Sequence, residues 1–380
     1  MNRSGRSLSL GRVFGIPIGL DYSWFVIFAL LVWSFSTSYY PLRFDSWAPG
    51  LYWAVGSLTA LLLFVSVLLH ELGHAVAAMA FHIPVRRIRL MIFGGVAELG
   101  DEAPNAGGEF LVAIAGPAVS ILIGVVLGFG WLGAQLTAGP EPLVALLSYL
   151  AFINIVLAVF NLIPGFPLDG GRVLRGIVWG VTGSLSRATR TAATIGRVLG
   201  FAFIGFGIFQ VLTGGLANGL WLSFIGLFLQ GAARAELEAQ TVRDLLQGRT
   251  VGQVMQRSYT TIPGSVTLQQ LVDAHVMGYG QRTYAVTEGD EVTGLLATDR
   301  VRHVPRARWP HTSAREAMTP LASSKQVAPD TELWAALRQM ELDQVAQLPV
   351  MEDGRLMGLL RREDVFRFLQ ALRKFGAQYA

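Results

Sequence analysis

An apolar run that ends in a pair of histidines is the feature that most constrains this chain. Residues 51–69 contain no charged side chain and lead directly into His70-Glu71-Leu72-Gly73-His74. A run of this length suits a helix that crosses a bilayer. Histidines four positions apart leave one face of a helix about one turn apart, so both imidazoles can bind one metal ion. Glu71 lies about 100° round from His70, where it can take a proton from a water molecule at that metal.

The position of this motif favours a functional site over a chance match. An H-E-x-x-H sequence arises often enough in soluble surface helices to be moderate support by itself. A charged side chain at the centre of a membrane helix, however, costs roughly 2.5–3.5 kcal/mol on insertion scales, and such residues are usually functional. With no cysteine in the chain, any metal must be bound by His, Asp or Glu.

The composition indicates a membrane protein with a soluble region after it. Of the 380 residues, 52% are hydrophobic and 15% are charged, and the long apolar runs lie before about residue 234. We expect about six transmembrane helices in a polytopic α-helical membrane domain over residues 1–231. The expected spans are residues 21–38, 51–69 with the motif at the far end, 110–133, 143–162, 198–212 and 216–233. Residues 232–248 form an expected helical linker, and residues 249–380 a soluble α+β region.

The distribution of arginines predicts how the chain crosses the membrane. Basic loops are expected at residues 82–90 and 172–190, and the N-terminus and the region after residue 234 are also basic. Cytoplasmic loops carry the excess of basic residues, so both termini are predicted to be cytoplasmic in a multi-pass protein of the cell membrane. The net charge of +4 comes without a basic patch interleaved with aromatic residues, so no nucleic-acid partner is expected.

A third metal ligand is predicted about 95 residues after His74. Residues 161–172 contain two prolines and three glycines, which break a helix at a membrane end and place Asp169 in the break. A catalytic zinc takes three protein ligands and keeps one open position, and a carboxylate is a usual third ligand after two histidines. The alternative is that Asp169 only caps the following helix.

Residues 94–99 allow two interpretations. Gly94 and Gly95 precede a short apolar segment, which suggests a hairpin or a re-entrant strand that lines a wet cavity. A plain surface turn is equally compatible with the residues. An exposed strand edge there could pair with an extended substrate segment.

The soluble region contains an internal duplication. Tyr284-Ala285-Val286 recurs as Leu348-Pro349-Val350, and Gly294-Leu295-Leu296 recurs as Gly358-Leu359-Leu360, both 64 residues later. Each copy, at about residues 249–308 and 312–371, is expected to form a short strand, a helix, two strands joined by an acidic turn and a second helix.

The membrane part resembles the site-2 protease family of intramembrane zinc metalloproteases. The resemblance rests on His70-Glu71-x-x-His74 with Leu168-Asp169-Gly170, supported by Phe93-Gly94-Gly95, Ala115-Gly116-Pro117 and Asn161-x-x-Pro164. It implies one zinc ion bound by His70, His74 and Asp169, with Glu71 activating water. It further implies that Asn161 orients the substrate or the developing oxyanion, and we expect Gly94 and Gly95 to take part in substrate binding.

The soluble part resembles a tandem pair of cystathionine-beta-synthase-type (CBS) domains, which often sense adenine nucleotides. The usual nucleotide-contacting pattern has Ser or Thr three residues after a glycine and Asp six residues after it. The first copy has Gly294, Ala297 and Arg300, and the second has Gly358, Arg361 and Asp364. Because both copies depart from the pattern, nucleotide binding and a purely dimerising or substrate-docking role stay open.

Two functions of different classes follow from these motifs. The first is an endopeptidase that cuts the transmembrane segment of a single-pass membrane protein in regulated intramembrane proteolysis, with the CBS pair as a regulator. The second is a CBS-gated ion transporter or channel whose intramembrane His and Asp groups line an ion path. A catalytically silent scaffold is disfavoured because all three ligands and the base are present.

Overall fold

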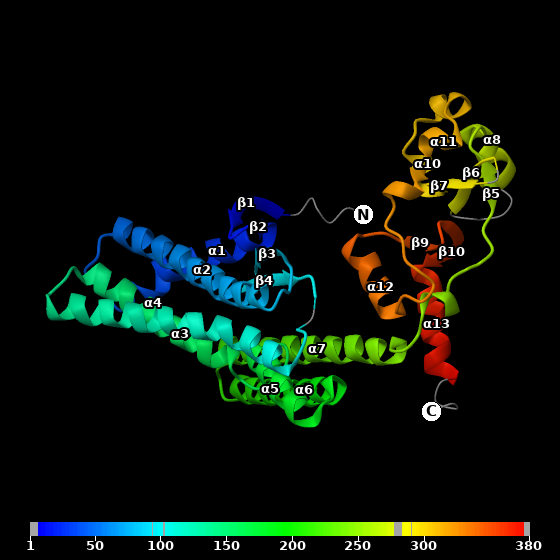
Figure 1. The fold of residues 1–380 in the computed structure, drawn as a ribbon. Helices are drawn as coiled ribbons and strands as arrows, with labels where there is room; N and C mark the ends of the chain where they lie inside the picture. Colours follow the sequence, from blue (N-terminus) through cyan, green and yellow to red (C-terminus); the bar gives the residue numbers. More distant parts are fainter. Residues whose placement is uncertain (1–6, 93, 102, 277–282, 290, 376–380) are drawn as a thin grey trace. The chain divides into compact units, whose positions relative to one another are not determined.

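The computed structural model describes residues 7–92, 94–101, 103–276, 283–289 and 291–375 (Figure 1). The chain divides into two compact units, Met1–Gln240 and Thr241–Ala380. The fold is a multi-span helical membrane unit followed by an α+β unit, as the sequence predicts. Each unit is described separately below.

Six helical segments of the first unit are long and apolar enough to cross a membrane. All six coincide with expected spans, although the helices extend further than the sequence analysis placed them. They are α1 (Tyr22–Ser34) with its continuation to Tyr39, α2 (Pro49–Ala80), α3 (Ala106–Leu136), α4 (Glu141–Asn161), α6 (Leu185–Leu212) and α7 (Leu216–Leu246).

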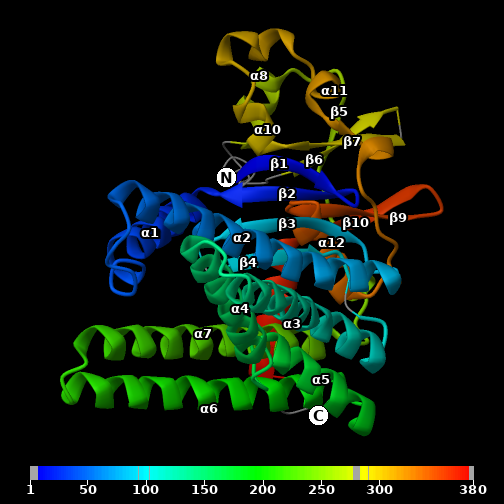
Figure 2. The same ribbon diagram turned by 90° about the vertical axis from the view of Figure 1, so that its left-hand side faces the viewer.

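Helix α3 packs between α2 and α4, and all three lie side by side (Figure 2). Glycines permit these close approaches: a Cβ at Gly73 of α2 would meet the backbone of Ala115, and one at Gly124 would meet Ile155 of α4. Helices α6 and α7 form an antiparallel pair, in which Gly200 and Gly207 face Gly226 and Gly219. Small residues at such crossings let helix backbones come into contact.

A four-stranded sheet lies against α2, with strand order β1-β2-β3-β4. Its strands are β1 (Ser7–Val13), β2 (Ile16–Asp21), β3 (Val85–Met91) and β4 (Gly94–Leu99). Strand β3 is parallel to β2 and antiparallel to β4, which leaves β4 at the edge of the sheet. Residues 94–99 are therefore a strand and not a plain turn.

Two segments that the sequence analysis predicted to be loops form regular secondary structure instead. Residues 82–90 were expected to be a basic loop, but most of them belong to β3, because Ile88 and Leu90 are buried against α2 and β2 while the arginines alternate with them. Residues 172–190 were also expected to be a loop, but they form most of α5 (Asp169–Thr182) and the start of α6. A left-handed Gly183 ends α5.

The second unit has two copies of one α+β pattern. The first contains β5 (Thr261–Pro263), α8 (Leu268–Leu271), β6 (Thr283–Glu288), β7 (Glu291–Ala297) and α10 (Thr298–Arg302). The second contains α12 (Leu333–Leu342), β9 (Gln347–Glu352), β10 (Arg355–Arg361) and α13 (Arg362–Phe375).

The entry segment of each copy pairs with the sheet of the other copy. Strand β8 (Thr319–Pro320) pairs with β7, and the bridge between Gln256 and Leu359 makes the equivalent contact on β10. In the second copy, Asp353 and Gly354 form the tight turn between β9 and β10, and both have positive φ. This is the geometry of a two-residue type I′ hairpin. The first copy's Asp290 lies outside the described residues.

Candidate metal centre

Helix α2 brings His70 and His74 to one buried point. Their side chains are spaced by one turn, both are about 95% buried, and their rings meet edge to face with centroids 4.9 Å apart. The two Nε2 atoms lie 3.2 Å from each other. The one-turn spacing of the motif thus places two nitrogen donors side by side.

Asp169 joins the two histidines although it is 95 positions after His74. It is the first residue of α5, and Leu168 occupies the N-cap position. Its Oδ2 atom lies 3.1 Å from His70 Nε2 and 3.2 Å from His74 Nε2. The side chain is therefore directed at the histidines and does not cap its own helix.

The three donor atoms fit a single metal ion. Zinc ligands at about 2.0–2.2 Å in a tetrahedral arrangement lie roughly 3.3–3.6 Å from one another. The three donor-to-donor distances of 3.1–3.2 Å are close to that spacing. Two imidazole nitrogens and a carboxylate oxygen are also the donor types that zinc takes in catalytic sites.

Gly116 of α3 leaves the space into which these donors point. A Cβ at this position would overlap His74 Nε2 and would lie 2.7 Å from His70 Nε2. Any side chain other than hydrogen would therefore occupy the volume at which the donors converge. Among the described residues, His70, His74 and Asp169 are the one group of three His, Asp or Glu side chains that could hold a metal.

Hydrogen bonds from α3 orient both histidine rings. His74 Nδ1 lies 2.7 Å from the carbonyl oxygen of Val112, and His70 Nδ1 lies 2.9 Å from Ser120 Oγ. A carbonyl oxygen only accepts, so Nδ1 of His74 carries the proton and its Nε2 lone pair is free to bind a metal. Such partners fix the tautomer and the direction of a ligating histidine.

Strand β4 positions the carboxylate of Glu71. The backbone N–H of Ala97 donates to Glu71 Oε2 at 3.2 Å, and a Cβ at Gly95 would overlap the Glu71 side chain. Gly95 thus permits the strand to approach the helix, and Gly94, with φ of 115°, adopts a backbone conformation that favours glycine. Phe93, the first residue of this motif, lies outside the described residues.

Asn161 is a predicted site residue that the structure does not join to the candidate ligands by a hydrogen bond. It is the last residue of α4, partly buried, at the start of the segment that leads to Asp169. Within the described part of the chain, no hydrogen bond joins Asn161 to the three candidate ligands or to Glu71. Conversely, sequence reasoning missed Val112 and Ser120, because their contacts with the histidines depend on the packing of α3 against α2.

Comparison with known proteins gives the family. The model for "Peptidase family M50" matches residues 58–138 and 133–204, and the model "CBS domain" matches residues 313–371. "Putative zinc metalloprotease Rip3" of Mycobacterium tuberculosis is 33% identical over 369 residues, which cover 97% of this chain and 94% of the relative. The chain belongs to peptidase family M50, the site-2 proteases.

Further relatives of this site-2 protease come from other organisms. "Zinc metalloprotease MJ0392" of Methanocaldococcus jannaschii is 29% identical and covers 96% of this chain and 97% of the relative. The solved "Site-2 Protease from Methanocaldococcus jannaschii" is 32% identical and covers 61% of this chain and 95% of its own, with a TM-score of 0.41.

Family membership settles the class of function. The chain is a multi-pass zinc metalloprotease that acts in the membrane, and it carries a CBS region. Intramembrane proteolysis is therefore the function, in preference to the CBS-gated transporter or channel. The family also implies zinc as the metal for which His70, His74 and Asp169 are available.

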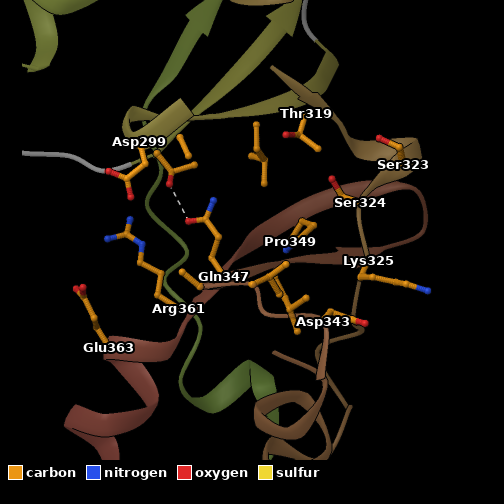
Figure 3. Close-up of a pocket in the computed structure, with 16 residues that line it drawn as sticks. Asp299, Thr319, Ser323, Ser324, Lys325, Asp343, Gln347, Pro349, Arg361 and Glu363 are labelled. Carbon is orange, nitrogen blue, oxygen red and sulfur yellow. Dashed lines mark hydrogen bonds between the residues drawn. The ribbon is translucent and has the colours of Figure 1, made fainter. Parts of the chain in front are cut away.

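A second site candidate lies in the CBS unit of this site-2 protease. A cavity of about 540 Å³ opens between the two copies, and Thr283 Oγ1 donates to Gln347 Oε1 across it at 2.7 Å (Figure 3). These two residues are 64 positions apart and begin the equivalent strands β6 and β9.

The lining of this cavity is only partly what the nucleotide pattern requires. Ala297 and Arg361 line it at the positions where the pattern has Ser or Thr. At the aspartate position of the pattern, only the second copy has an aspartate, Asp364. Its side chain is buried, and its carboxylate accepts a hydrogen bond from Arg367. Asp299 and Glu363, which are equivalent in the two copies, supply carboxylates instead.

Proposed function

We propose that His70, His74 and Asp169 hold one zinc ion and that Glu71 is the general base of peptide hydrolysis. The substrate class is the transmembrane segment of a single-pass membrane protein. The observation that carries this assignment is the convergence of two Nε2 atoms and one carboxylate oxygen, 3.1–3.2 Å apart, beside Gly116.

Glu71 and the backbone of Ala97 have separate roles in the proposed reaction. When bound, zinc would polarise the scissile carbonyl and acidify a water molecule at the site. Glu71 accepts the proton of the attacking water and passes it to the leaving amine, a role worth about 10²–10⁴ in rate. The Ala97 N–H holds the Glu71 carboxylate by one oxygen, which supports a fixed orientation for proton transfer.

The edge of β4 is suited to hold the substrate. A transmembrane helix must unwind before it is cut, because its carbonyls are hydrogen-bonded within the helix. Among the strands that the structure describes, β4 has a neighbour on one side only; it begins with Gly94 and Gly95, and Gly95 lies close to Glu71. Pairing along that edge would place an extended segment beside the base. Asn161 is proposed to orient the substrate or the developing oxyanion, a role carried over from the family.

The rest of the chain is proposed to orient and regulate this site. Arginines near the ends of α2, α5 and α6 support the proposal that the termini are cytoplasmic and that the metal centre is near the cytoplasmic surface. The CBS pair, with the helical residues 232–248 before it, is proposed as a regulatory region that acts through dimerisation or through a ligand in its cavity. An adenine nucleotide is one candidate ligand, with mixed support from the lining residues.

Two substitutions test the assignment. Glu71→Gln removes the base but none of the three ligands, so zinc content should match that of the parent while cleavage falls at least about 100-fold. His74→Ala removes a ligand, so zinc content and cleavage should both be lost. Zinc is measured on the purified full-length chain, and cleavage is measured as fragments of candidate single-pass proteins co-expressed with it.

Glu238→Gln is the matched control. Glu238 forms an exposed i,i+4 ion pair with Arg234, far from the ligands in sequence, so this change should leave both readouts unchanged. Cleavage by the Glu71→Gln form at the parental rate would end the assignment of the base. Full zinc content in the His74→Ala form would end the assignment of the metal site.

A further inference from the structure

One face of α3 contacts both histidines of the candidate metal centre. Glu109, Val112, Gly116 and Ser120 follow the spacing 0, 3, 7 and 11, which keeps residues on one side of a helix. The carbonyl oxygen of Val112 accepts a hydrogen bond from His74, and the hydroxyl group of Ser120 is hydrogen-bonded to His70. Gly116 lines the space between the two histidines. The candidate metal centre involves these three positions but not Glu109.

Glu109 is a carboxylate that is 98% buried in the first turn of α3. Two arginines of α5 reach it: Nε of Arg172 and Nε of Arg175 each lie 3.1 Å from Glu109 Oε1. Arg175 also donates to Glu236 of α7 at 3.2 Å, and its guanidinium lies 5.2 Å from the ring of Phe166. The carboxylate thus joins α3 to the helix that begins with Asp169.

The two arginines hold the end of α5 that carries the ligand. Arg172 lies one turn after Asp169, on the same side of the helix. Leu168 provides no side-chain cap, and the Asp169 side chain is directed at the histidines. Glu109 therefore joins α3 to the first two turns of α5 by side-chain hydrogen bonds to Arg172 and Arg175.

Stability alone does not account for this buried cluster. A buried ion pair usually contributes little compared with apolar residues of the same volume, because both charges lose their hydration. The best-supported role of a buried ion pair is to specify one arrangement of the packed elements over the alternatives. We propose that Glu109 is a positioning residue, which fixes Asp169 against the two histidines through Arg172 and Arg175. This inference rests on the proposed zinc site.

Metal affinity of the full-length chain in detergent tests the proposal. Glu109→Gln keeps the shape of the side chain but removes the charge that both arginines share. Loss of the partners that orient a ligand typically lowers metal affinity 10–100-fold. We expect that loss for Zn²⁺ in chelator competition, together with a changed absorption spectrum of the Co²⁺-substituted protein. Arg172→Gln should show the same effects to a smaller extent, because Arg175 still holds Glu109.

Two reference variants separate the possible outcomes. His74→Ala must lose the metal; if it binds as the parent does, the zinc site itself is wrong. Tyr40→Phe removes the 2.7 Å hydrogen bond between Tyr40 and Thr59, a buried contact outside the site, and should leave the affinity unchanged.

The positioning role is overturned if Glu109→Gln binds Zn²⁺ within twofold of the parent while His74→Ala does not bind. It is equally overturned if Tyr40→Phe weakens binding as much as Glu109→Gln does, because the effect would then be general destabilisation. Where the Glu109→Gln protein cannot be recovered folded, Arg172→Gln decides by the same two criteria, since the Arg172 side chain is one-quarter exposed and tolerates a neutral residue more readily.

Discussion

At the scale of single residues, the proposed metal centre depends as much on the absence of a side chain at position 116 as on the candidate ligands. His70, His74 and Asp169 supply the donors, but their convergence requires that α3 carry glycine at position 116. Elsewhere a helix is weakened by glycine by about 1 kcal/mol relative to alanine. The glycine at position 116 is therefore explained by the site and not by the helix.

Gly116→Ala should abolish metal binding without loss of the fold. The added methyl group would occupy the space in which the two Nε2 atoms meet, so the histidines cannot both keep their positions around an ion. Zinc content of the purified chain and cleavage of a co-expressed substrate should fall together, while the helical content measured by circular dichroism is retained.

Gly128→Ala is the control for that substitution. Gly128 lies in the same helix, and a Cβ there would meet no atom within 4 Å. The control should bind zinc as the parent does. Equal zinc content in the Gly116→Ala protein would show that the donors do not converge at this glycine.

At the scale of whole elements, sequence patterns predicted the helices and the repeat, but they did not predict the contacts between elements. The helix of His70 and His74, the helix break before Asp169 and the 64-residue duplication could all be predicted, because each is visible as a pattern in the sequence. The support from Val112, Gly116 and Ser120 depends on how α3 packs against α2, which no local pattern contains. Strand β3 was wrongly predicted to be a loop because its arginines were interpreted as a basic connection. The alternation of buried Ile88 and Leu90 with arginine was not recognised as a strand pattern.

The approach of strand β4 to helix α2 gives the next prediction. In Gly95→Ala the new methyl group would overlap the Glu71 side chain and push the base away from the Ala97 N–H. We expect zinc content near the parental value and cleavage reduced at least tenfold, since general-base catalysis contributes about 10²–10⁴ and needs hydrogen-bond reach. The separation of the two readouts distinguishes this effect from that of Gly116→Ala.

Gly205→Ala provides the comparison for Gly95→Ala. A Cβ at Gly205, in α6, would also meet no atom within 4 Å, so both readouts should stay parental. Parental cleavage by the Gly95→Ala protein would mean that the strand does not set the position of the base.

At the scale of the whole molecule, the charges at the ends of the helices predict the side of the membrane from which the proposed site is reached. His70 and His74 lie in the last turns of α2, and Asp169 begins α5. Arg86 and Arg87 follow the end of α2, Arg172 lies in the first turn of α5, and Arg187 lies in the first turn of α6. The opposite ends are joined by residues 40–48, 137–140 and 213–215, in which Arg43 is the single basic residue.

This asymmetry predicts cytoplasmic termini, because short cytoplasmic connections retain arginine. A fluorescent protein that matures only in the cytoplasm should be bright when fused at the C-terminus, and alkaline phosphatase fused there should be inactive. Inserted between α3 and α4, at residues 137–140, the two reporters should give the reverse result. Six spans place both termini on one side, so a reporter at the N-terminus must agree with the one at the C-terminus.

The opposite pattern of reporter activity would move the metal centre to the outer surface, where an impermeant chelator added to intact cells should strip the zinc. With cytoplasmic termini, the same chelator should act only on inverted vesicles. The chelator result depends on the position of the ligands near the ends of α2 and α5, whereas the reporter result depends only on the order of the spans. Agreement of the two would therefore place the catalytic chemistry, and not merely the termini, on the cytoplasmic side.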